Sequence, residues 1–333
     1  MMLNNEIKAA GIIGTGSYMP ETVLTNSYFE ERLDTNDEWI VSRTGIKERR
    51  KAEESVATSD IATYAALKAI EDANLNPEDL DMIIVATVTP DMSFPSTACI
   101  VQKNIGAINA SAFDISAACS GFIYGLSIAE KFIKTGSAKY ILVIGAETLS
   151  KITDYSDRNT CVLFGDGAGA AVVSSVEENN GILASYTGSD GRGGDLLKLP
   201  AGGSRMPASM ETLANRLHYT KMDGSEVFKF AIKIMGEAAE KALEMCGLDK
   251  KDIDYLIPHQ ANIRIIESAT KRLKIPKDKV FVNIDKYGNM SAASIAVALD
   301  EANKANKLSK GDVVVLVGFG GGLTWGSIVL RWA

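Results

Sequence analysis

The chain repeats part of its own sequence. A shift of 173 positions aligns residues 65–84 with residues 238–257 without a gap, and nine of these 20 positions are identical. Composition alone would give about one or two identities. The match covers a helical pattern, the turn after it and the start of an apolar segment, and the same shift aligns the apolar segments 140–145 and 313–318. A chain built from two similar halves is therefore expected.

The same observations give the expected organisation of the chain. An N-terminal half is expected over residues 1–175 and a C-terminal half over residues 176–333, with a connecting segment near residues 176–225. Helical patterns alternate with short runs of Ile, Val and Leu, which predicts helices and strands in alternation. The helices are expected at Asp60–Asn74, Gly121–Thr135 and Phe228–Cys246, and the strands after them at Met82–Thr87, Tyr140–Gly145 and Tyr255–Pro258. This order is typical of an α/β fold with mostly parallel sheets, in which ligands bind beyond the carboxyl ends of the strands.

The composition excludes several classes of protein. The net charge of −7 argues against nucleic acid as a general partner, because a phosphate backbone requires a basic surface. No apolar run reaches the roughly 18 residues of a membrane span, and the polar N-terminal segment is not typical of a secretory signal. The four cysteines are widely separated and the chain has two histidines, so we expect no structural metal, no disulfide and a cytoplasmic location.

Cys119 is a candidate nucleophile. It precedes residues 121–129, which are almost entirely apolar and predict a buried helix. The amide groups and the dipole at a helix N-terminus favour an anion, so the thiol pKa is expected to lie below the free value of ~8.5. A lone cysteine is more often a small buried side chain, and that role is assigned to Cys99, Cys161 and Cys246.

Two further polar residues are expected beside Cys119. His259 ends an apolar segment at the position where the first half has Ala86, and Asn289 stands in a loop that leads into a helical pattern. Taken alone, such a histidine is as often structural, and an asparagine near glycine is usually part of a turn. All three residues closely follow predicted strands, so one pocket can hold them. The second histidine, His218, is expected on the surface.

Glycines near the C-terminus suggest a place for a ligand. Gly320, Gly321 and Gly322 follow the predicted strand Val313–Val317, and glycine allows the backbone to approach a ligand closely. Amide groups of this turn and of Cys119 together could stabilise a negatively charged thioester oxygen. No phosphate-binding loop is present, and the Gly-Thr-Gly at residues 14–16 lacks the third glycine of a dinucleotide-binding motif.

These motifs together resemble the thiolase superfamily and, within it, the 3-oxoacyl-[acyl carrier protein] synthase III family. The resemblance runs the length of the chain, through Gly14–Pro20, Asp37–Ile40, Arg43–Ile46 and Gly320–Gly326. It implies a thiolase-like, five-layered α-β-α-β-α fold from two duplicated halves, a homodimer and no cofactor. The implied reaction is a decarboxylative Claisen condensation of an acyl-CoA primer with malonyl-acyl carrier protein, which starts fatty acid synthesis.

The resemblance also implies roles for individual residues. Cys119 takes the acyl group, His259 and Asn289 donate hydrogen bonds to the thioester oxygen, and the amides of Cys119 and Gly321 form the oxyanion hole. The CoA contacts are Trp39 and Arg158 at the adenine, Arg43 and Thr44 at the phosphate end, and Met222, Gly224, Phe228 and Asn262 along the pantetheine. Leu149 and Phe164 match the acyl pocket, and Phe94 matches a residue that reaches across a dimer interface.

A basic segment is the exception to the acidic composition. Between residues 261 and 274, four cationic side chains are accompanied by a single acidic one, Glu267. Arg264 and Lys271 are seven residues apart and therefore share a helix face. Because carrier proteins are acidic, we expect Arg264, Lys271 and Arg272 to dock one, although charge alone fits a solvated face equally well.

Other functions remain open from the sequence. A related condensing or acyl-transfer enzyme of secondary metabolism has the same residues, and the length and branching of the primer are not determined. Papain-like cysteine hydrolases also use Cys, His and Asn, but they lack the duplication and have a Cys-Gly-Ser/Ala-Cys-Trp motif that this chain does not contain. A binding protein without catalysis is the third alternative.

Overall fold

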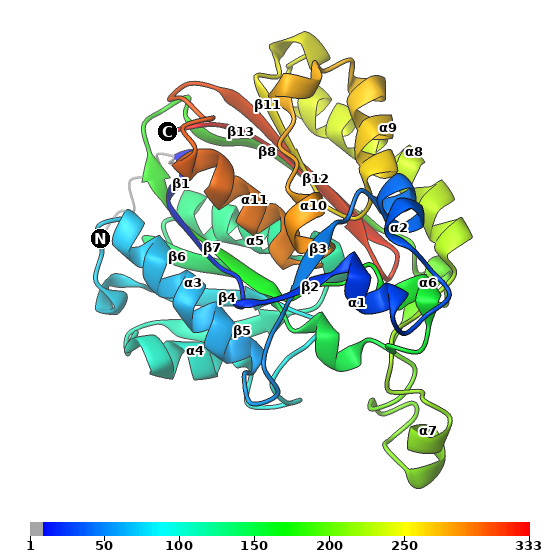
Figure 1. Ribbon diagram of the computed structural model, residues 1–333. Coiled ribbons are helices and arrows are strands. Elements are labelled where there is room, and N and C mark those ends of the chain that lie inside the picture. Colours follow the sequence, from blue (N-terminus) through cyan, green and yellow to red (C-terminus); the bar gives the residue numbers. More distant parts are fainter. Residues whose placement is uncertain (1–8) are drawn as a thin grey trace.

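The computed structural model describes residues 9–333, which form two large β-sheets with helices between them and on both outer sides, and two small two-stranded sheets (Figure 1). The first sheet has five strands in the spatial order β1 (Ala9–Tyr18), β7 (Gly167–Val176), β6 (Tyr140–Glu147), β4 (Met82–Ala86) and β5 (Ser111–Ile115). The second has four strands in the order β11 (Tyr255–Pro258), β12 (Val313–Gly320), β13 (Thr324–Arg331) and β8 (Gly181–Ser189).

The two sheets have the same topology, which confirms the duplication. Read as β8, β13, β12 and β11, the second sheet repeats the first: two antiparallel pairings are followed by a parallel one. The equivalent of β5 is reduced to a single parallel bridge between Leu256 and Val280. Strands β4 and β6 begin 173 positions before β11 and β12, the shift found in the sequence.

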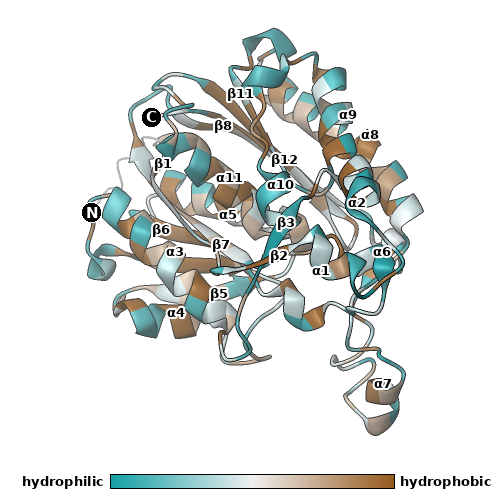
Figure 2. Ribbon diagram, viewed as in Figure 1, coloured by the Kyte–Doolittle hydropathy of each residue, from teal (hydrophilic) through white to brown (hydrophobic). Residues whose placement is uncertain are grey.

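Five layers follow from the packing of the helices. Helices α5 (Gly121–Lys134) and α11 (Ala293–Lys304) lie between the sheets, in one apolar core with residues of both. Helices α3 (Thr58–Asp72) and α4 (Thr97–Ile105) cover the outer face of the first sheet, and α8 (Gly224–Met245) and α9 (Ile263–Leu273) cover that of the second. Figure 2 shows the apolar residues of α5 and α11 in the middle of the molecule. The thiolase-like α-β-α-β-α architecture is thus confirmed.

The remaining elements form the rim of the molecule. They are β2 (Thr22–Thr25), α1 (Asn26–Glu30), α2 (Asp37–Thr44), β3 (Glu48–Lys51), α6 (Arg158–Cys161), β9 (Leu197–Lys198), α7 (Met210–Ala214), β10 (Lys221–Met222) and α10 (Ile284–Tyr287). Six 3₁₀ turns complete them: η1 (Pro77–Asp79), η2 (Ala118–Ser120), η3 (Leu149–Ile152), η4 (Gly191–Gly193), η5 (Lys250–Asp252) and η6 (Lys277–Lys279). Within residues 9–333, no helix has the length and apolar character needed to cross a membrane.

The segment between the halves is shorter than the sequence suggested. Strand β8 already belongs to the second sheet, so the chain crosses from one half to the other within residues 177–180. The other predicted elements agree with the structure to within a few residues. The largest difference is at α8, which begins at Gly224 rather than Phe228 because the Asp223 carboxylate accepts a hydrogen bond from the Glu226 amide and caps the helix one turn earlier.

Candidate active site

Cys119 lies in a tight turn between strand β5 and helix α5. The turn is the 3₁₀ segment η2, and Ala118 just before the cysteine has a left-handed backbone with φ of 45°. The Ser120 and Thr324 hydroxyl groups are 2.6 Å apart, and they lie 2.8 and 2.9 Å from the Ala117 carbonyl oxygen. Because Thr324 begins β13, these contacts fix the cysteine turn of the first half to the sheet of the second.

The pKa of the Cys119 thiol differs from the expected value. Cys119 is 7% exposed, and burial raises the pKa of its thiol to about 12, although the Ser291 hydroxyl lowers it. The expected pKa below the free value was therefore wrong for the resting enzyme. The physical reason is that the loss of water around a thiolate outweighs the favourable effect of the helix N-terminus. Cys119 rests as a neutral thiol.

His259 follows strand β11 and is completely buried. Its backbone amide donates to the Val317 carbonyl at 2.8 Å, which fixes it beside strand β12, and its ring meets that of Phe319 edge to face at 5.8 Å. Burial lowers the pKa of His259 to about 3, so the imidazole is neutral at physiological pH. Neither ring nitrogen has a hydrogen-bond partner within residues 9–333. A neutral imidazole has one donor and one acceptor, and both are available to a ligand here.

Asn289 is held by the loop before helix α11. Its amide donates to the Leu163 carbonyl at 2.9 Å, and its carbonyl accepts from Gly165 at 3.0 Å, so the loop pairs with the chain beside Phe164. The side-chain oxygen accepts a hydrogen bond from the Ser291 amide at 2.8 Å. With the oxygen engaged, the NH₂ group is the part of the carboxamide that can donate to a ligand.

A narrow cavity joins these three side chains. It has a volume of about 90 Å³, the space of roughly three water molecules. The side chains that line it therefore surround the same small space. Cys119, His259 and Asn289 all line it. The four residues assigned to the pantetheine, Met222, Gly224, Phe228 and Asn262, also line it.

Cys119 also lines a second, wider cavity of about 810 Å³. Leu149 and Phe164, the two residues assigned to an acyl pocket, are part of its wall. Cys119 and Phe164 line both cavities, so the thiol stands where the narrow cavity meets the wide one. Phe94 does not line the wide cavity of its own chain and is 85% exposed.

The glycine turn after β12 lies directly against the cysteine. A side chain at Gly320 would place its Cβ 2.5 Å from the Cys119 amide nitrogen, a distance that only glycine avoids. Gly321 lies next to Ala118 and lines the wide cavity together with Cys119. The amide-bearing backbone at Cys119 and at Gly321 is therefore adjacent.

Glu147 is a buried acid near the thiol that the sequence interpretation missed. It ends strand β6, and its carboxylate accepts hydrogen bonds from the Thr89 hydroxyl at 2.6 Å and from the Val88 amide at 3.2 Å. Burial raises the pKa of Glu147 to about 7, and its negative charge raises the pKa of Cys119. The Ser291 hydroxyl makes no hydrogen bond of standard geometry within residues 9–333, yet it lowers the pKa of both groups. The signal in the sequence was a charged residue at the end of a buried strand.

Three of the proposed CoA contacts gather on the rim. The guanidinium groups of Arg43 and Arg158 lie 4.9 and 5.1 Å from the Trp39 ring centre. Arg158 also donates to the Asp34 carbonyl at 2.5 Å. A planar base stacked between Trp39 and Arg158 needs about 7 Å, two van der Waals contacts. The Arg158 side chain, 42% exposed, would move outward by about 2 Å to admit it.

Two predicted residues are occupied by contacts within the chain. Thr44 is buried, and its hydroxyl donates to the Ile40 carbonyl at 2.6 Å and accepts from the Ile46 amide at 3.0 Å, which leaves no free donor for a phosphate. Arg272 donates to both carboxylate oxygens of Glu240, at 3.2 and 2.6 Å, and so joins α9 to α8. Its pairing was not visible in the sequence, because Glu240 is 32 residues away.

Arg264 and Lys271 both remain exposed on α9. Arg264 lies 5.1 Å from the ring of Phe228, a residue of the narrow cavity, so it stands close to that opening.

The remaining cysteines and the second histidine lie away from these cavities. Cys99, Cys161 and Cys246 are free thiols that line neither one. The ring of His218 is 3.0 Å from the Thr212 hydroxyl, outside the site. Within residues 9–333, no three His, Cys, Asp or Glu side chains are grouped so that they could hold a metal ion.

The fold and these cavities define the class of protein: a thiolase-like acyltransferase in which a cysteine shares a narrow cavity with a neutral imidazole and a carboxamide. Comparisons with known proteins agree with this class. The family model described as "3-Oxoacyl-[acyl-carrier-protein (ACP)] synthase III" matches residues 113–191, and that of its C-terminal part matches residues 243–332.

Relatives match over nearly the whole chain. The beta-ketoacyl-[acyl-carrier-protein] synthase III of Caldanaerobacter subterraneus subsp. tengcongensis is 66% identical over 325 residues, which are 98% of each chain. The enzyme of the same name from Clostridioides difficile is 64% identical over 323 residues, 97% of this chain and 98% of that one. The chain therefore belongs to the 3-oxoacyl-[acyl-carrier-protein] synthase III family, as its motifs indicated.

Solved structures give the same result. The 3-oxoacyl-[acyl-carrier-protein] synthase III of Aquifex aeolicus is 51% identical, with a TM-score of 0.89 over 97% of this chain and 100% of that chain. The priming beta-ketosynthase of the R1128 polyketide pathway has a TM-score of 0.91 at 34% identity, over 98% of this chain and 97% of that chain.

Proposed function

We propose that this enzyme condenses an acyl-CoA primer with malonyl-acyl carrier protein, with loss of CO₂, to give 3-oxoacyl-acyl carrier protein. The main support is that Cys119 lines both cavities and shares the narrow one with His259, whose two ring nitrogens have no hydrogen-bond partner within residues 9–333. The narrow cavity, with a volume of about 90 Å³, suits the thiol end of the pantetheine arm that CoA and carrier proteins share. The wide cavity suits the acyl group.

The first half-reaction loads the acyl group onto Cys119. His259, whose ring nitrogens have no other hydrogen-bond partner within residues 9–333, accepts the thiol proton as the sulfur attacks the thioester carbonyl. The amides of Cys119 and Gly321 hold the oxygen while it is negatively charged. The carbon–sulfur bond to CoA then breaks, and the departing thiolate takes the proton from His259.

The second half-reaction forms the carbon–carbon bond. The malonyl carboxylate leaves as CO₂, and its electron pair forms an enolate whose oxygen accepts hydrogen bonds from His259 and from the NH₂ group of Asn289. The enolate carbon attacks the acyl carbonyl carbon on Cys119, the bond between that carbon and the Cys119 sulfur breaks, and the released thiolate takes a proton from solvent. Neutral donors suit this step, because both remain uncharged in the buried cavity.

Mass spectrometry of the intact protein tests the loading step. After incubation with acetyl-CoA or a longer acyl-CoA, we expect Cys119 to gain the mass of the acyl group, and malonyl-acyl carrier protein to remove it with release of CO₂. A series of straight and branched acyl-CoAs would identify the primer. An unmodified Cys119 with every thioester would contradict the proposed function.

The relatives support a role in starting fatty acid synthesis. The bacterial enzymes named synthase III reach 66% identity, whereas the polyketide priming enzyme reaches 34%. A condensing enzyme of secondary metabolism is the alternative. No cofactor is part of the proposed reaction, since the CoA thioester is a substrate. Four free thiols support a reducing compartment, the cytoplasm.

A homodimer is part of the proposal. Phe94 is 85% exposed, and its neighbours Met92 and Ser93 line the wide cavity. A second copy of the chain could therefore bring its own Phe94 to the opening and close the acyl pocket.

The carrier protein is proposed to dock on α9 beside the narrow cavity. Arg264 and Lys271 are exposed there, whereas Arg272 is paired with Glu240, so the docking surface is smaller than the sequence suggested. Replacing Arg264 with Ala should lower kcat/KM for malonyl-acyl carrier protein about tenfold, because an acidic partner loses a cation next to the cavity. Loading from acyl-CoA should change by less than about twofold.

Lys310 provides the control for charge alone. It is exposed and pairs with Glu177, far along the chain from α9. A Lys310→Ala variant should retain both half-reactions. An equal loss of the two half-reactions in Arg264→Ala would count against docking at this surface.

A further inference from the structure

A long arm forms one side of the wide cavity. Residues 199–220 leave the body after β9 and return at β10, which pair as antiparallel strands at the base of the arm. Helix α7 lies in this arm, away from the rest of the molecule (Figure 1). Such an arm needs contacts at its base to hold a defined position against the body.

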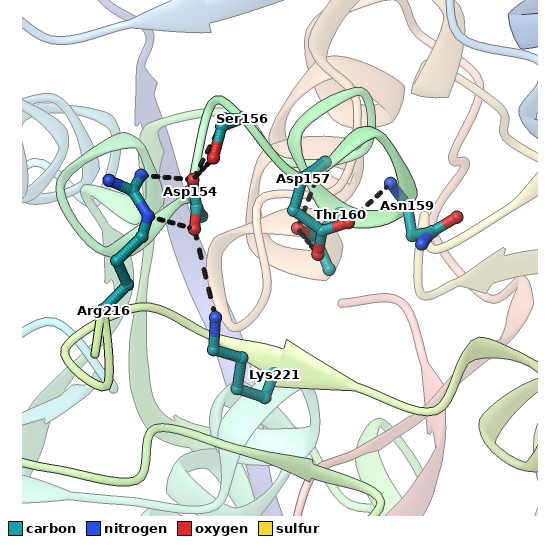
Figure 3. A network of polar contacts seen from close by, with 7 residues as sticks. All are labelled: Asp154, Ser156, Asp157, Asn159, Thr160, Arg216 and Lys221. Atoms are coloured by element: carbon teal, nitrogen blue, oxygen red, sulfur yellow. Dashed lines mark hydrogen bonds and ion pairs between the residues drawn. The ribbon is translucent and has the colours of Figure 1, made fainter.

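The base is fastened by a buried carboxylate. Arg216 donates to both oxygens of Asp154, from Nε at 2.8 Å and from Nη2 at 2.5 Å. Ser156 donates to the same carboxylate from its amide and its hydroxyl, and Lys221 lies 3.9 Å away (Figure 3). The Asp154 side chain is 5% exposed, and the guanidinium holds the pKa of this carboxyl well below its usual range. A two-pronged pair of this kind fixes orientation as well as distance.

The pair joins two neighbouring segments of the wall of the wide cavity. Asp154 follows the turn η3, from which Leu149 and Ile152 line the cavity. Arg216 belongs to the arm, whose base contributes Leu197, Leu199 and Thr220 to the lining. The Thr220 amide also donates to the Ile152 carbonyl at 2.8 Å, between the same two segments. Neither Asp154 nor Arg216 lines the cavity, so the pair acts on its shape only through these segments.

We propose that Asp154 and Arg216 are positioning residues that set the width of the wide cavity and thereby limit the length and branching of the acyl group that Cys119 accepts. This proposal rests on the proposed function, because it requires the acyl group to occupy the wide cavity. A single methylene changes selectivity about 10- to 200-fold in a well-fitted pocket, so a small movement of one wall is sufficient to alter it.

The same loop continues to the rim where CoA is proposed to bind. The Asp157 amide donates to the Asp154 carbonyl at 2.9 Å, and the Asp157 carboxylate caps α6, which begins at Arg158 (Figure 3). Loss of the pair could therefore also weaken binding of CoA. This effect would be equal for all acyl-CoAs, so a ratio between two of them reports on the acyl wall alone.

The test measures loading of Cys119 by the full-length protein with acetyl-CoA, hexanoyl-CoA and isobutyryl-CoA. In Arg216→Ala, kcat/KM for the two larger thioesters relative to acetyl-CoA should rise about fivefold or more, because the arm is released from η3. Arg216→Lys keeps the charge but not the second hydrogen bond, so its ratios should lie between those of the wild type and Arg216→Ala.

Arg192 gives a matched control. Its guanidinium forms an equally two-pronged pair with Asp190, at 2.9 and 2.7 Å, but neither residue lines the wide cavity. Arg192→Ala should leave the ratios unchanged.

Two outcomes would overturn the inference. If the wild type is loaded normally but the ratios of kcat/KM do not rise in the Arg216 variants, the pair has only a structural role and the inference is wrong. A wild type that no thioester loads would overturn the proposed function and this inference with it. Thermal unfolding shows whether each variant is folded. If Arg216→Ala does not fold, the ratios of Arg216→Lys test the inference instead.

Discussion

A Cys119→Ala variant is expected to form no acyl-enzyme and to lose condensation by at least about 10⁴-fold, because the acyl group then has no covalent carrier between the two half-reactions. Loading is measured by mass spectrometry and condensation by the appearance of 3-oxoacyl-carrier protein. The variant should fold normally, since it removes only one buried sulfur atom. Release of CO₂ from malonyl-acyl carrier protein should persist, because the free donors of His259 and Asn289 remain.

Cys161 is the matched control for this prediction. It is buried like Cys119, and burial likewise raises the pKa of its thiol, to about 11, but it lines neither cavity. Cys161→Ala should therefore retain both half-reactions. Normal turnover in Cys119→Ala, or an acyl group on Cys161 in the wild type, would show that the nucleophile has been misassigned.

An Asn289→Ala variant should separate the two half-reactions. Removing one donor from a preorganised oxyanion site costs about 10²- to 10³-fold in rate, so condensation should fall by that factor. Loading should change by only a few fold, since Asn289 is not the proton acceptor. His259→Ala should impair both half-reactions, because the same ring accepts the thiol proton and donates to the enolate oxygen.

His218 serves as the control for the histidine substitution. It is the only other histidine, and its ring contacts Thr212 in the arm rather than either cavity. His218→Ala should retain full activity in both steps. If Asn289→Ala lost loading as severely as condensation, its carboxamide would have to act on the acyl-CoA as well, and the division of roles proposed above would be wrong.

Much of the architecture was predictable because the sequence pattern of one half is repeated in the other. The pairs β4 and β11, and β6 and β12, stand 173 positions apart, and each is a continuous apolar run of the kind that a strand buried on both faces requires. The exact crossing between the halves was not predictable. Strand β8 has nine residues, but most of them are only partly buried or exposed, so its pattern did not distinguish it from a connecting loop.

The candidate site was predictable in its residues but not in its electrostatics. The position of Cys119 before a helix suggested an acidic thiol, whereas its burial beside Glu147 gives the opposite shift. Thr44 matched a family position and Arg272 belonged to the basic segment 261–274, yet internal hydrogen bonds occupy both side chains. These outcomes depend on which groups surround a side chain in space.

The order and spacing of residues by themselves determined the duplicated α/β halves, the family, and the three residues Cys119, His259 and Asn289 that line one cavity, because periodicity and motifs are local properties of a chain. Only the tertiary structure decided the protonation states of Cys119 and His259, the division into a narrow and a wide cavity, and the Asp154–Arg216 pair across 62 positions. Desolvation and long-range pairing depend on contacts between distant segments, and those contacts exist only after the chain has folded.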